Sequence, residues 1–204
     1  MSFTNFLPIS ALVRSCQRSF TASFHAGVSE EWPEIGGLIC TCYNSRMNEI
    51  NYITGDATQP DAEGKKIIVH VCNDIGGWGK GFVLALSKRW KQPEAEYRRW
   101  HNGDDDRPFE LGQVQFVPVE SDLWVANLIG QRGIRRSGGK PPVRYDAIKA
   151  GLDRVSTFAE EHQASVHMPR IGCGLAGGSW DEIEPLIIDT LIAAGVSVTV
   201  YDFG

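Results

Sequence analysis

The sequence lacks any apolar run close to the roughly 20 residues that a membrane-spanning helix needs. It also lacks the apolar core of a signal peptide, because Pro8, Ser10 and Arg14 interrupt the stretch that follows Met1. Internal repeats and low-complexity tracts are missing as well. These absences favour a cytoplasmic protein that does not associate with membranes.

The cysteines provide neither a zinc-binding pattern nor a disulfide framework. Their number is odd, at five, and they show no C-x-x-C spacing and no nearby pair of histidines. We therefore expect no metal site, and nothing in the sequence calls for a cofactor. Cys72 and Cys173 each end a strand-like run, which is typical of a small buried side chain. The alternative is a reactive thiol.

An excess of positive charge is also missing, since the net charge is -5 at pH 7. This balance argues against a general electrostatic grip on nucleic acid or on an anionic membrane, although a local basic patch can still serve either. The 204 residues, 42% of them hydrophobic, suffice for one globular domain with an appended segment.

The first 46 residues show no sustained hydrophobic period, and we predict an N-terminal extension over residues 1–46 and a domain over 47–204. A clean pattern begins directly after Met47. Met47 is therefore either the native start or a residue within a longer chain. Mass spectrometry of the native N-terminus distinguishes the two.

Strand and helix patterns alternate through the rest of the chain. The strands are predicted at 50–53, 66–72, 114–117, 123–129, 166–171 and 196–201. The helices are predicted at 81–90, 94–100, 145–161 and after Ser179, which forms a capping box with Glu182. This alternation predicts an α/β fold, a three-layer α/β/α sandwich with a mixed, largely parallel sheet.

Two glycine-rich turns, Gly76–Gly81 and Gly172–Gly178, each follow a predicted strand and lead into a predicted helix. Glycine lets backbone N–H groups approach an anion, and the N-terminus of the next helix adds favourable partial charge. Ligands of such sheets bind beyond the carboxyl ends of the strands, where both turns lie. The pair predicts a clamp for two linked phosphates.

Four polar residues near the first turn each allow a purely structural and a functional interpretation. Asp56 either initiates a turn or accepts a hydrogen bond from an exocyclic amine such as that of adenine. Asn73 either forms an Asx turn or holds a sugar hydroxyl. His70 is either packed within its strand or catalytic. Lys80 either meets a phosphate or is solvated.

Two further segments could contact a ligand. The stretch 130–140 is glycine-rich, contains four cations close together, among them Arg132, and is either a solvated loop or a cover over a phosphate or nucleic-acid backbone. Tyr201 ends the last predicted strand, where its ring either stacks on a base or is simply buried.

Three segments together resemble the macrodomain family, over a region that runs from about residue 48 to the C-terminus. They are Gly55-Asp56-Ala57, HVCNDIGGWGKG at 70–81 and MPRIGCGLAGGSW at 168–180. Within the family, residues 70–90 look like the branch that hydrolyses ADP-ribose 1″-phosphate. MPRIGCGL and the closing VTVYDFG are also similar to the branch of the terminal ADP-ribose protein glycohydrolase.

The resemblance implies ADP-ribose, or a derivative of it, as the ligand. It implies that Asp56 binds adenine, that Tyr201 lies near adenine, and that His70 and Asn73 are catalytic. The ligand-binding residues implied are Gly55, Asp56, Ala57, Asn73, Gly76, Gly77, Trp78, Gly79, Lys80, Gly81, Gln131, Arg132, Ile171, Gly172, Cys173, Gly174, Leu175, Ala176, Gly177 and Tyr201. No metal is implied.

The sequence departs from the glycohydrolase branch at two positions. Gln131 and Ala176 stand where that branch has a nucleophilic lysine and an assisting aspartate. Neither residue can form a Schiff base or act as a general base, so this covalent route is disfavoured. We therefore expect hydrolysis of ADP-ribose 1″-phosphate to ADP-ribose and phosphate. The alternatives are removal of ADP-ribose from protein or nucleic acid, and a reader that binds without turnover.

Overall fold

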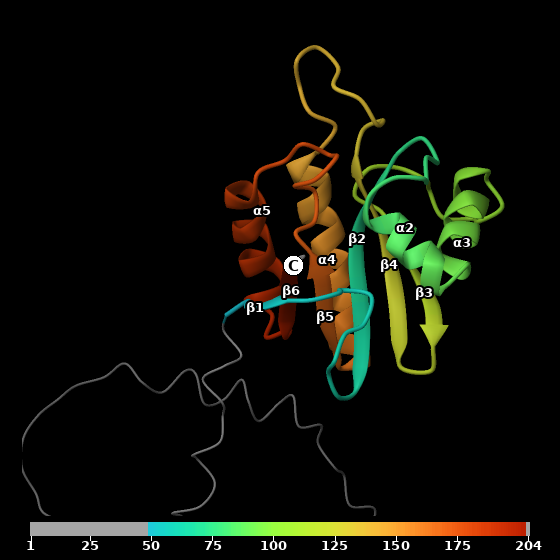
Figure 1. The fold of residues 1–204 in the computed structure, drawn as a ribbon. Helices are drawn as coiled ribbons and strands as arrows, with labels where there is room; N and C mark the ends of the chain where they lie inside the picture. The colour runs from blue at the N-terminus through green and yellow to red at the C-terminus, as the bar shows by residue number, and fades with distance from the viewer. Residues whose placement is uncertain (1–48, 203–204) are drawn as a thin grey trace, which may run out of the picture. The chain divides into compact units, whose positions relative to one another are not determined.

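The domain is built on a six-stranded, mostly parallel sheet, as the sequence predicts (Figure 1). The computed structural model describes residues 49–202, so the predicted extension and the proposed start at Met47 lie outside the described residues. The strands are β1 (Asn51–Thr54), β2 (Lys65–Asn73), β3 (Val114–Glu120), β4 (Leu123–Gln131), β5 (Ala164–Pro169) and β6 (Val198–Asp202). Their order is β1-β6-β5-β2-β4-β3, and of these neighbours β3 alone runs antiparallel to its partner.

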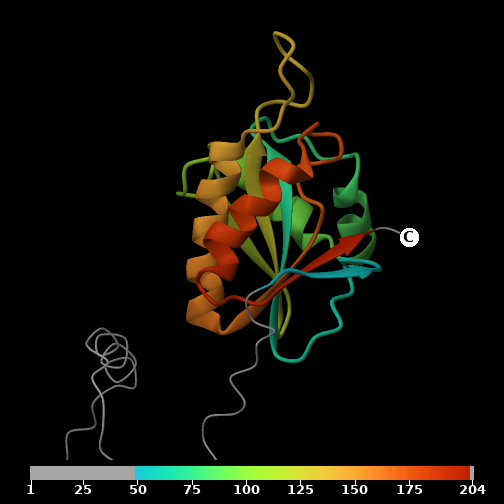
Figure 2. The ribbon, with the colours of Figure 1, turned by 90° about the vertical axis from the view of Figure 1, so that its left-hand side faces the viewer.

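Helices cover both faces of the sheet and complete the predicted three layers. They are α2 (Phe82–Arg89), α3 (Gln92–His101), α4 (Tyr145–His162) and α5 (Trp180–Ile187), and α5 continues as the π-helix η1 (Ile188–Ile192). Figure 2 shows α4 and α5 in front of the sheet, with α2 and α3 behind it.

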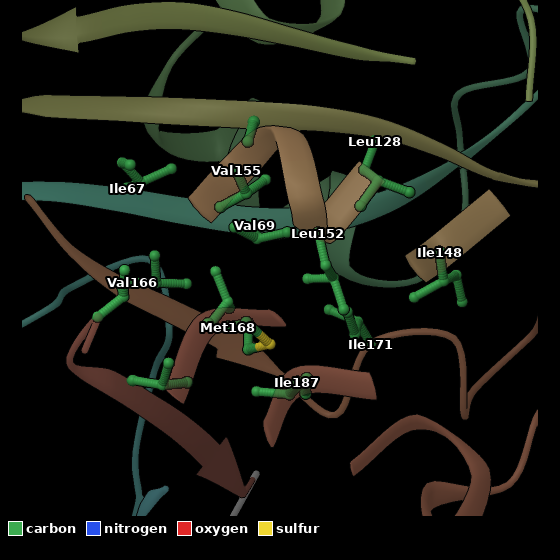
Figure 3. Close-up of a cluster of buried hydrophobic side chains, with 14 of the residues drawn as sticks. Ile67, Val69, Leu128, Ile148, Leu152, Val155, Val166, Met168, Ile171 and Ile187 are labelled. Atoms are coloured by element: carbon green, nitrogen blue, oxygen red, sulfur yellow. The ribbon is translucent and has the colours of Figure 1, made fainter. Parts of the chain in front are cut away.

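The central strand β2 is buried on both faces, and its alternating side chains enter two different cores. Ile67 and Val69 pack with residues of α4 and α5 in the larger core, which Figure 3 shows in close-up. Ile68 and Cys72 face the opposite layer, where they pack against side chains of α2 and α3. His70 lies between these two and therefore also points toward α2 and α3.

The topology places the two glycine turns and the basic stretch at one edge of the sheet. Because β1, β6, β5, β2 and β4 run in parallel, their carboxyl ends all meet at the same edge of the sheet. The two glycine turns leave this edge from β2 and β5, as predicted. The basic stretch leaves it from β4 and projects beyond it (Figure 1).

The predicted capping box at the start of α5 is wrong in its side-chain detail. Ser179 is the N-cap residue, but its side chain makes no capping hydrogen bond. The backbone supplies the contact instead, because Glu182 N donates to Ser179 O at 3.3 Å.

Among residues 49–202, no helix has both the length and the apolar character needed to cross a bilayer.

Candidate functional site

Asp56 forms the first part of the site, in the turn that follows β1. One carboxylate oxygen accepts hydrogen bonds from Thr58 N at 2.9 Å and Thr58 Oγ1 at 2.8 Å. The other accepts from Gln59 Nε2 at 3.1 Å. Burial by itself would raise the pKa of Asp56, but these hydrogen bonds outweigh it and hold the pKa below its ordinary value. The turn therefore presents an ionised, half-buried carboxylate.

Tyr201 lies beside this turn, at the end of β6. Its ring carbon Cδ1 is 3.6 Å from the position that a Cβ on Gly55 would occupy, so the missing side chain lets the two segments approach. The Tyr201 hydroxyl is 3.1 Å from His167 Nδ1, and only 6% of the residue is exposed. Tyr201 thus lies against Gly55, which precedes Asp56, and most of its ring is already buried.

The first glycine loop is held in shape by Asn73. Its amide nitrogen donates to Gly77 O at 2.6 Å, and its amide oxygen accepts from Gly77 N at 2.8 Å. Tyr97 supports the same residue by donating from its hydroxyl to Asn73 O at 2.6 Å. Asn73 is 6% exposed, and its side-chain amide is hydrogen-bonded within the loop. This is the Asx-type role that the sequence left open.

Glycine is required at Gly76 for two reasons. Its φ is 70°, a conformation that residues with a side chain rarely adopt. A Cβ there would also lie 2.6 Å from the ring of His101. The imidazole of α3 therefore supports the underside of the loop.

His70 is buried beneath the first glycine loop and does not reach the sheet edge. Its Nε2 lies 2.6 Å from Asn127 Oδ1, and its ring meets Trp78 edge-on with centroids 5.4 Å apart. Asn127 donates from Nδ2 to Pro93 O and Gln115 Oε1, so its oxygen is the acceptor and His70 Nε2 carries the proton. Burial lowers the pKa of His70 to about 4, more than the Asn127 hydrogen bond raises it. A neutral, packed histidine does not fit the catalytic contact predicted for it.

The second glycine loop closes on itself and reaches the first. Gly178 N donates to Gly172 O at 2.9 Å, and Gly177 N donates to Gly174 O at 3.0 Å. Leu175, which is 68% exposed, extends from this loop so that its Cδ1 lies 3.4 Å from where a Cβ on Gly81 would stand. The two glycine turns therefore lie side by side.

Both loops present unpaired N–H groups. Within residues 49–202, the backbone N–H groups of Gly174, Leu175 and Ala176 donate to no acceptor, and neither do those of Trp78, Gly79 and Lys80. Successive N–H groups of this kind form a concave site that attracts anions. The side chains of Ala57, Ile171 and Ala176 are buried, so these predicted ligand-binding residues can offer only backbone atoms.

Cys173 in the second loop is half-buried. Burial raises the pKa of its thiol above the ordinary value, and nearby Arg170 reduces that rise. Cys72 is fully buried, and burial raises its pKa further. Because a raised pKa keeps the thiol protonated at neutral pH, both residues fit the interpretation of small packed side chains.

The base of the basic stretch is tied to the end of β2 by Asp74. Asp74 Oδ1 accepts from Gly133 N at 2.6 Å, and Asp74 N donates to Gln131 O at 3.0 Å. Gln131 also bonds to Gly133, through Nε2 to O at 3.0 Å. Arg132 Nε lies 3.9 Å from Asp74 Oδ2, with 68% of the Arg132 side chain exposed. Asp74 is thus an additional candidate site residue, to which no sequence motif assigns a role.

A surface pocket of about 320 Å³ opens beside Asp74 and Arg132. Phe109, Glu110 and Leu111, from the connection between α3 and β3, complete its lining. Sequence patterns gave no signal for these three residues, because they precede β3 in an irregular segment. The Phe109 ring packs against Trp100 and His101, with centroids 5.0 Å apart in each case, and against Tyr97 at 5.5 Å.

Solved structures with high sequence identity share this fold. A macrodomain protein from Streptomyces coelicolor is 58% identical, covers 76% of this chain and 100% of its own, and superposes with a TM-score of 0.69. A Bacteroides thetaiotaomicron protein of unknown function is 59% identical over 76% of this chain and 98% of its own, with a TM-score of 0.73. The macrodomain of Mycobacterium tuberculosis DarG is 23% identical, with a TM-score of 0.61 over 76% of this chain and 97% of that one, and supports the fold alone.

Curated relatives are more distant. Chromodomain-helicase-DNA-binding protein 1-like from Danio rerio is 33% identical over 78% of this chain, yet the chain spans only 16% of its length. The ADP-ribose 1″-phosphate phosphatase of Saccharomyces cerevisiae is 24% identical over 76% of this chain and 99% of its own. The DNA ADP-ribosyl glycohydrolase of Mycobacterium tuberculosis is 24% identical over 68% of this chain and 38% of its own. No family model matches the chain.

The fold is an α/β domain in which two glycine loops with unpaired N–H groups lie side by side at the carboxyl edge of the sheet. The 58% identity to the macrodomain protein of Streptomyces coelicolor, over the full length of that protein, identifies the family. This chain belongs to the macrodomain family.

Proposed function

We propose that this macrodomain binds ADP-ribose along the carboxyl edge of its sheet. The observation that carries the proposal is the contact between two glycine loops that both present unpaired N–H groups. The diphosphate occupies the space between them. Asp56 and Tyr201 lie on the β1 and β6 side and receive adenine, while the distal ribose points toward the ends of β2 and β4.

We further propose that the protein hydrolyses ADP-ribose 1″-phosphate, with water as the second substrate and ADP-ribose and phosphate as products. The similarity to three yeast phosphatases of this name, which the chain covers over 89 to 99% of their lengths, supports this choice. Their identity to this chain is 22 to 26%, which leaves the activity for experiment.

The positions of Asp74, His70 and Asn73 suggest a different role for each in the proposed reaction. Asp74 is the carboxylate at the distal end, and it can orient water or accept its proton. His70 acts behind the loop by supporting Trp78, and Asn73 acts by fixing the loop around Gly77. Both are then positioning residues, in place of the direct catalytic roles predicted from the sequence.

Phosphate release from ADP-ribose 1″-phosphate tests the proposed reaction. Asp74→Asn should lower kcat by about 10²- to 10⁴-fold, the usual contribution of a general base, with ADP-ribose affinity changed much less. Asp153→Asn, on the exposed face of α4, is the matched control. No phosphate release by the unmodified protein would exclude the phosphatase, and unchanged kcat in Asp74→Asn would exclude the role of Asp74.

A second candidate activity is removal of ADP-ribose from nucleic acid or protein. The exposed basic stretch that leaves β4, with Arg132, Arg135 and Arg136, favours it because these cations can meet a polyanion. Assays on ADP-ribosylated DNA and protein decide between the candidates. Tight binding of ADP-ribose without turnover of any of these substrates would instead indicate a reader.

A further inference from the structure

We propose that Arg136, in the basic stretch that leaves β4, is a further binding residue for the diphosphate of ADP-ribose. The inference rests on the proposed ADP-ribose site and adds a side chain to the backbone N–H groups of the second glycine loop. The resemblance assigns Arg132 to the ligand but not Arg136, which the sequence marks only as one of four cations close together.

The tip of the basic stretch is a tight turn and not an open loop. Ser137 N donates to Lys140 O and Lys140 N donates to Ser137 O, both at 3.1 Å. Gly138 and Gly139 lie between them, with φ values of 58° and 77°. Positive φ at both central residues is the conformation of a type I′ turn, which glycine adopts without strain. Arg136, directly before this turn, therefore projects from a backbone of defined shape.

The second half of the stretch is attached to the second glycine loop. Val143 N donates to Ala176 O at 3.1 Å. Pro141 Cβ lies 3.1 Å from the position that a Cβ on Gly177 would occupy, so the absence of a side chain at Gly177 permits this close approach. The basic stretch and the second glycine loop are therefore neighbours, and a side chain of the stretch can reach an anion on the loop.

The Arg136 guanidinium lies between the tip of the stretch and the second glycine loop. Its Nη1 donates to Gly139 O at 3.4 Å, and its Nη2 lies 3.9 Å from the Cβ position of Gly177. Within residues 49–202, Arg136 forms no ion pair, and its Nε and Nη2 donate to no acceptor. Arg170, by contrast, donates to the Asp202 carboxylate at 2.5 and 2.9 Å. Arg136 thus keeps its charge and most of its N–H donors available beside the loop.

The charge of the ligand calls for such a group. Each phosphate of the diphosphate carries a full negative charge near neutral pH, whereas backbone N–H groups supply only partial positive charges. The first glycine turn contains a cation, Lys80, but the second turn, Gly172–Gly178, contains none. Arg136 supplies this charge from the neighbouring segment. A guanidinium is also suited to phosphate because its planar N–H groups can bond two phosphate oxygens at once.

Calorimetric titrations with ADP-ribose and with adenosine, which lacks the phosphates, test the role of Arg136. Arg136→Ala should weaken ADP-ribose binding by about tenfold to a hundredfold, because a charge-assisted hydrogen bond is lost. Its affinity for adenosine should be unchanged, which also shows that the variant is folded. Arg136→Lys should retain part of the ADP-ribose affinity, since it keeps the charge but loses the planar N–H geometry. The salt dependence of ADP-ribose binding should also be smaller in Arg136→Ala.

Arg154→Ala is the matched control. Arg154 is exposed on α4, and its Nη1 donates to the backbone oxygen of Ala150 at 3.1 Å, much as Arg136 donates to Gly139 O. The substitution removes the same side chain and the same charge from a residue outside the proposed site. This variant should bind ADP-ribose like the unmodified protein.

The outcomes separate the two proposals. If Arg136→Ala binds ADP-ribose like the unmodified protein, the role of Arg136 is overturned and the ADP-ribose site stands. If adenosine affinity falls by the same factor as ADP-ribose affinity, Arg136 only maintains the shape of the loops, and its contact with phosphate is excluded. If the unmodified protein does not bind ADP-ribose, the proposed function fails and this inference fails with it. Unchanged ADP-ribose affinity together with weaker binding of a single-stranded DNA oligonucleotide would assign the cation to a nucleic-acid backbone instead.

Discussion

The Asp56 carboxylate is already held by three hydrogen bonds from its own turn. Thr58 uses one oxygen twice, while the other receives only the Gln59 amide at 3.1 Å. A ligand amine would therefore approach the second oxygen. Substitution at this residue changes both the shape of the turn and the charge that it presents.

We predict that Asp56→Asn weakens ADP-ribose binding by about tenfold to a hundredfold, because a charge-assisted hydrogen bond of roughly 1.5–3 kcal/mol is lost. Isothermal titration calorimetry measures the change. Asp153→Asn, which alters an exposed carboxylate of α4, should bind like the unmodified protein. Equal affinities for Asp56→Asn and the unmodified protein would remove Asp56 from the site.

We predict that Asn73→Asp distorts the first glycine loop. The new carboxylate would face Gly77 O, to which the amide now donates at 2.6 Å, so a donor is replaced by a like-charged acceptor. The free energy of unfolding should fall by about 1–3 kcal/mol, and ADP-ribose affinity should fall with it. Urea denaturation and calorimetry measure the two effects. Asn102→Asp, at the exposed end of α3, should leave both nearly unchanged.

The first glycine loop depends on a neighbouring helix for its shape, since the His101 ring of α3 lies directly under Gly76. Gly64 provides a matched comparison, because its φ of 79° is similar to that of Gly76 but nothing lies within 4 Å of its Cβ position. A substitution at Gly64 therefore shows the effect of backbone strain alone. The same substitution at Gly76 adds the steric overlap.

We predict that Gly64→Ala costs about 1–2 kcal/mol of unfolding free energy, the usual cost of a left-handed residue with a Cβ. Gly76→Ala should cost more and should also lower ADP-ribose affinity at least tenfold. Adding His101→Ala to Gly76→Ala should restore part of the loss. Urea denaturation and calorimetry decide the matter: equal effects of the two alanines would mean that the helix does not constrain the loop.

The elements were predictable because their signals are local. The β-branched run of β2 and the helical stripe of α4 each carry their own period, and the sheet brings both glycine loops to one edge as expected. The roles of Asn73 and His70 could not be deduced in this way. Their partners, Gly77 and Asn127, are set by the loop's exact path and by strand pairing. The pocket residues were missed for the same reason, since three separate segments form it.

At the scale of the whole molecule, two histidines, His70 and His167, are buried in the sheet and uncharged. Burial lowers the pKa of His70 to about 4. Burial, with a smaller effect of Lys66, also lowers the pKa of His167 to about 4. In the unfolded chain both would titrate near their ordinary value of 6.5. Below that pH the unfolded chain takes up protons that the folded protein excludes.

We predict that the free energy of unfolding is steady above about pH 6.5 and falls as the pH drops from there toward about 4, by up to about 1.4 kcal/mol per pH unit for each histidine. Urea denaturation along this range measures the slope. His70→Gln and His167→Gln should each reduce it. Carboxyl groups with a lowered pKa, such as Asp56, lose their contribution only below 3.8 and so act in a separate window. A slope that neither variant changes would contradict the prediction.

The strand order also determines when the binding site can exist during synthesis. The last strand in chain order, β6, lies between β5 and the first strand, β1, and supplies Tyr201. Among the described residues, β1 has no strand partner other than β6. A growing chain whose β6 is still inside the ribosome already contains both glycine loops. It lacks Tyr201 and the strand that pairs with β1, so the proposed adenine side of the site is incomplete. The proposed ADP-ribose site is therefore complete only once β6 has emerged.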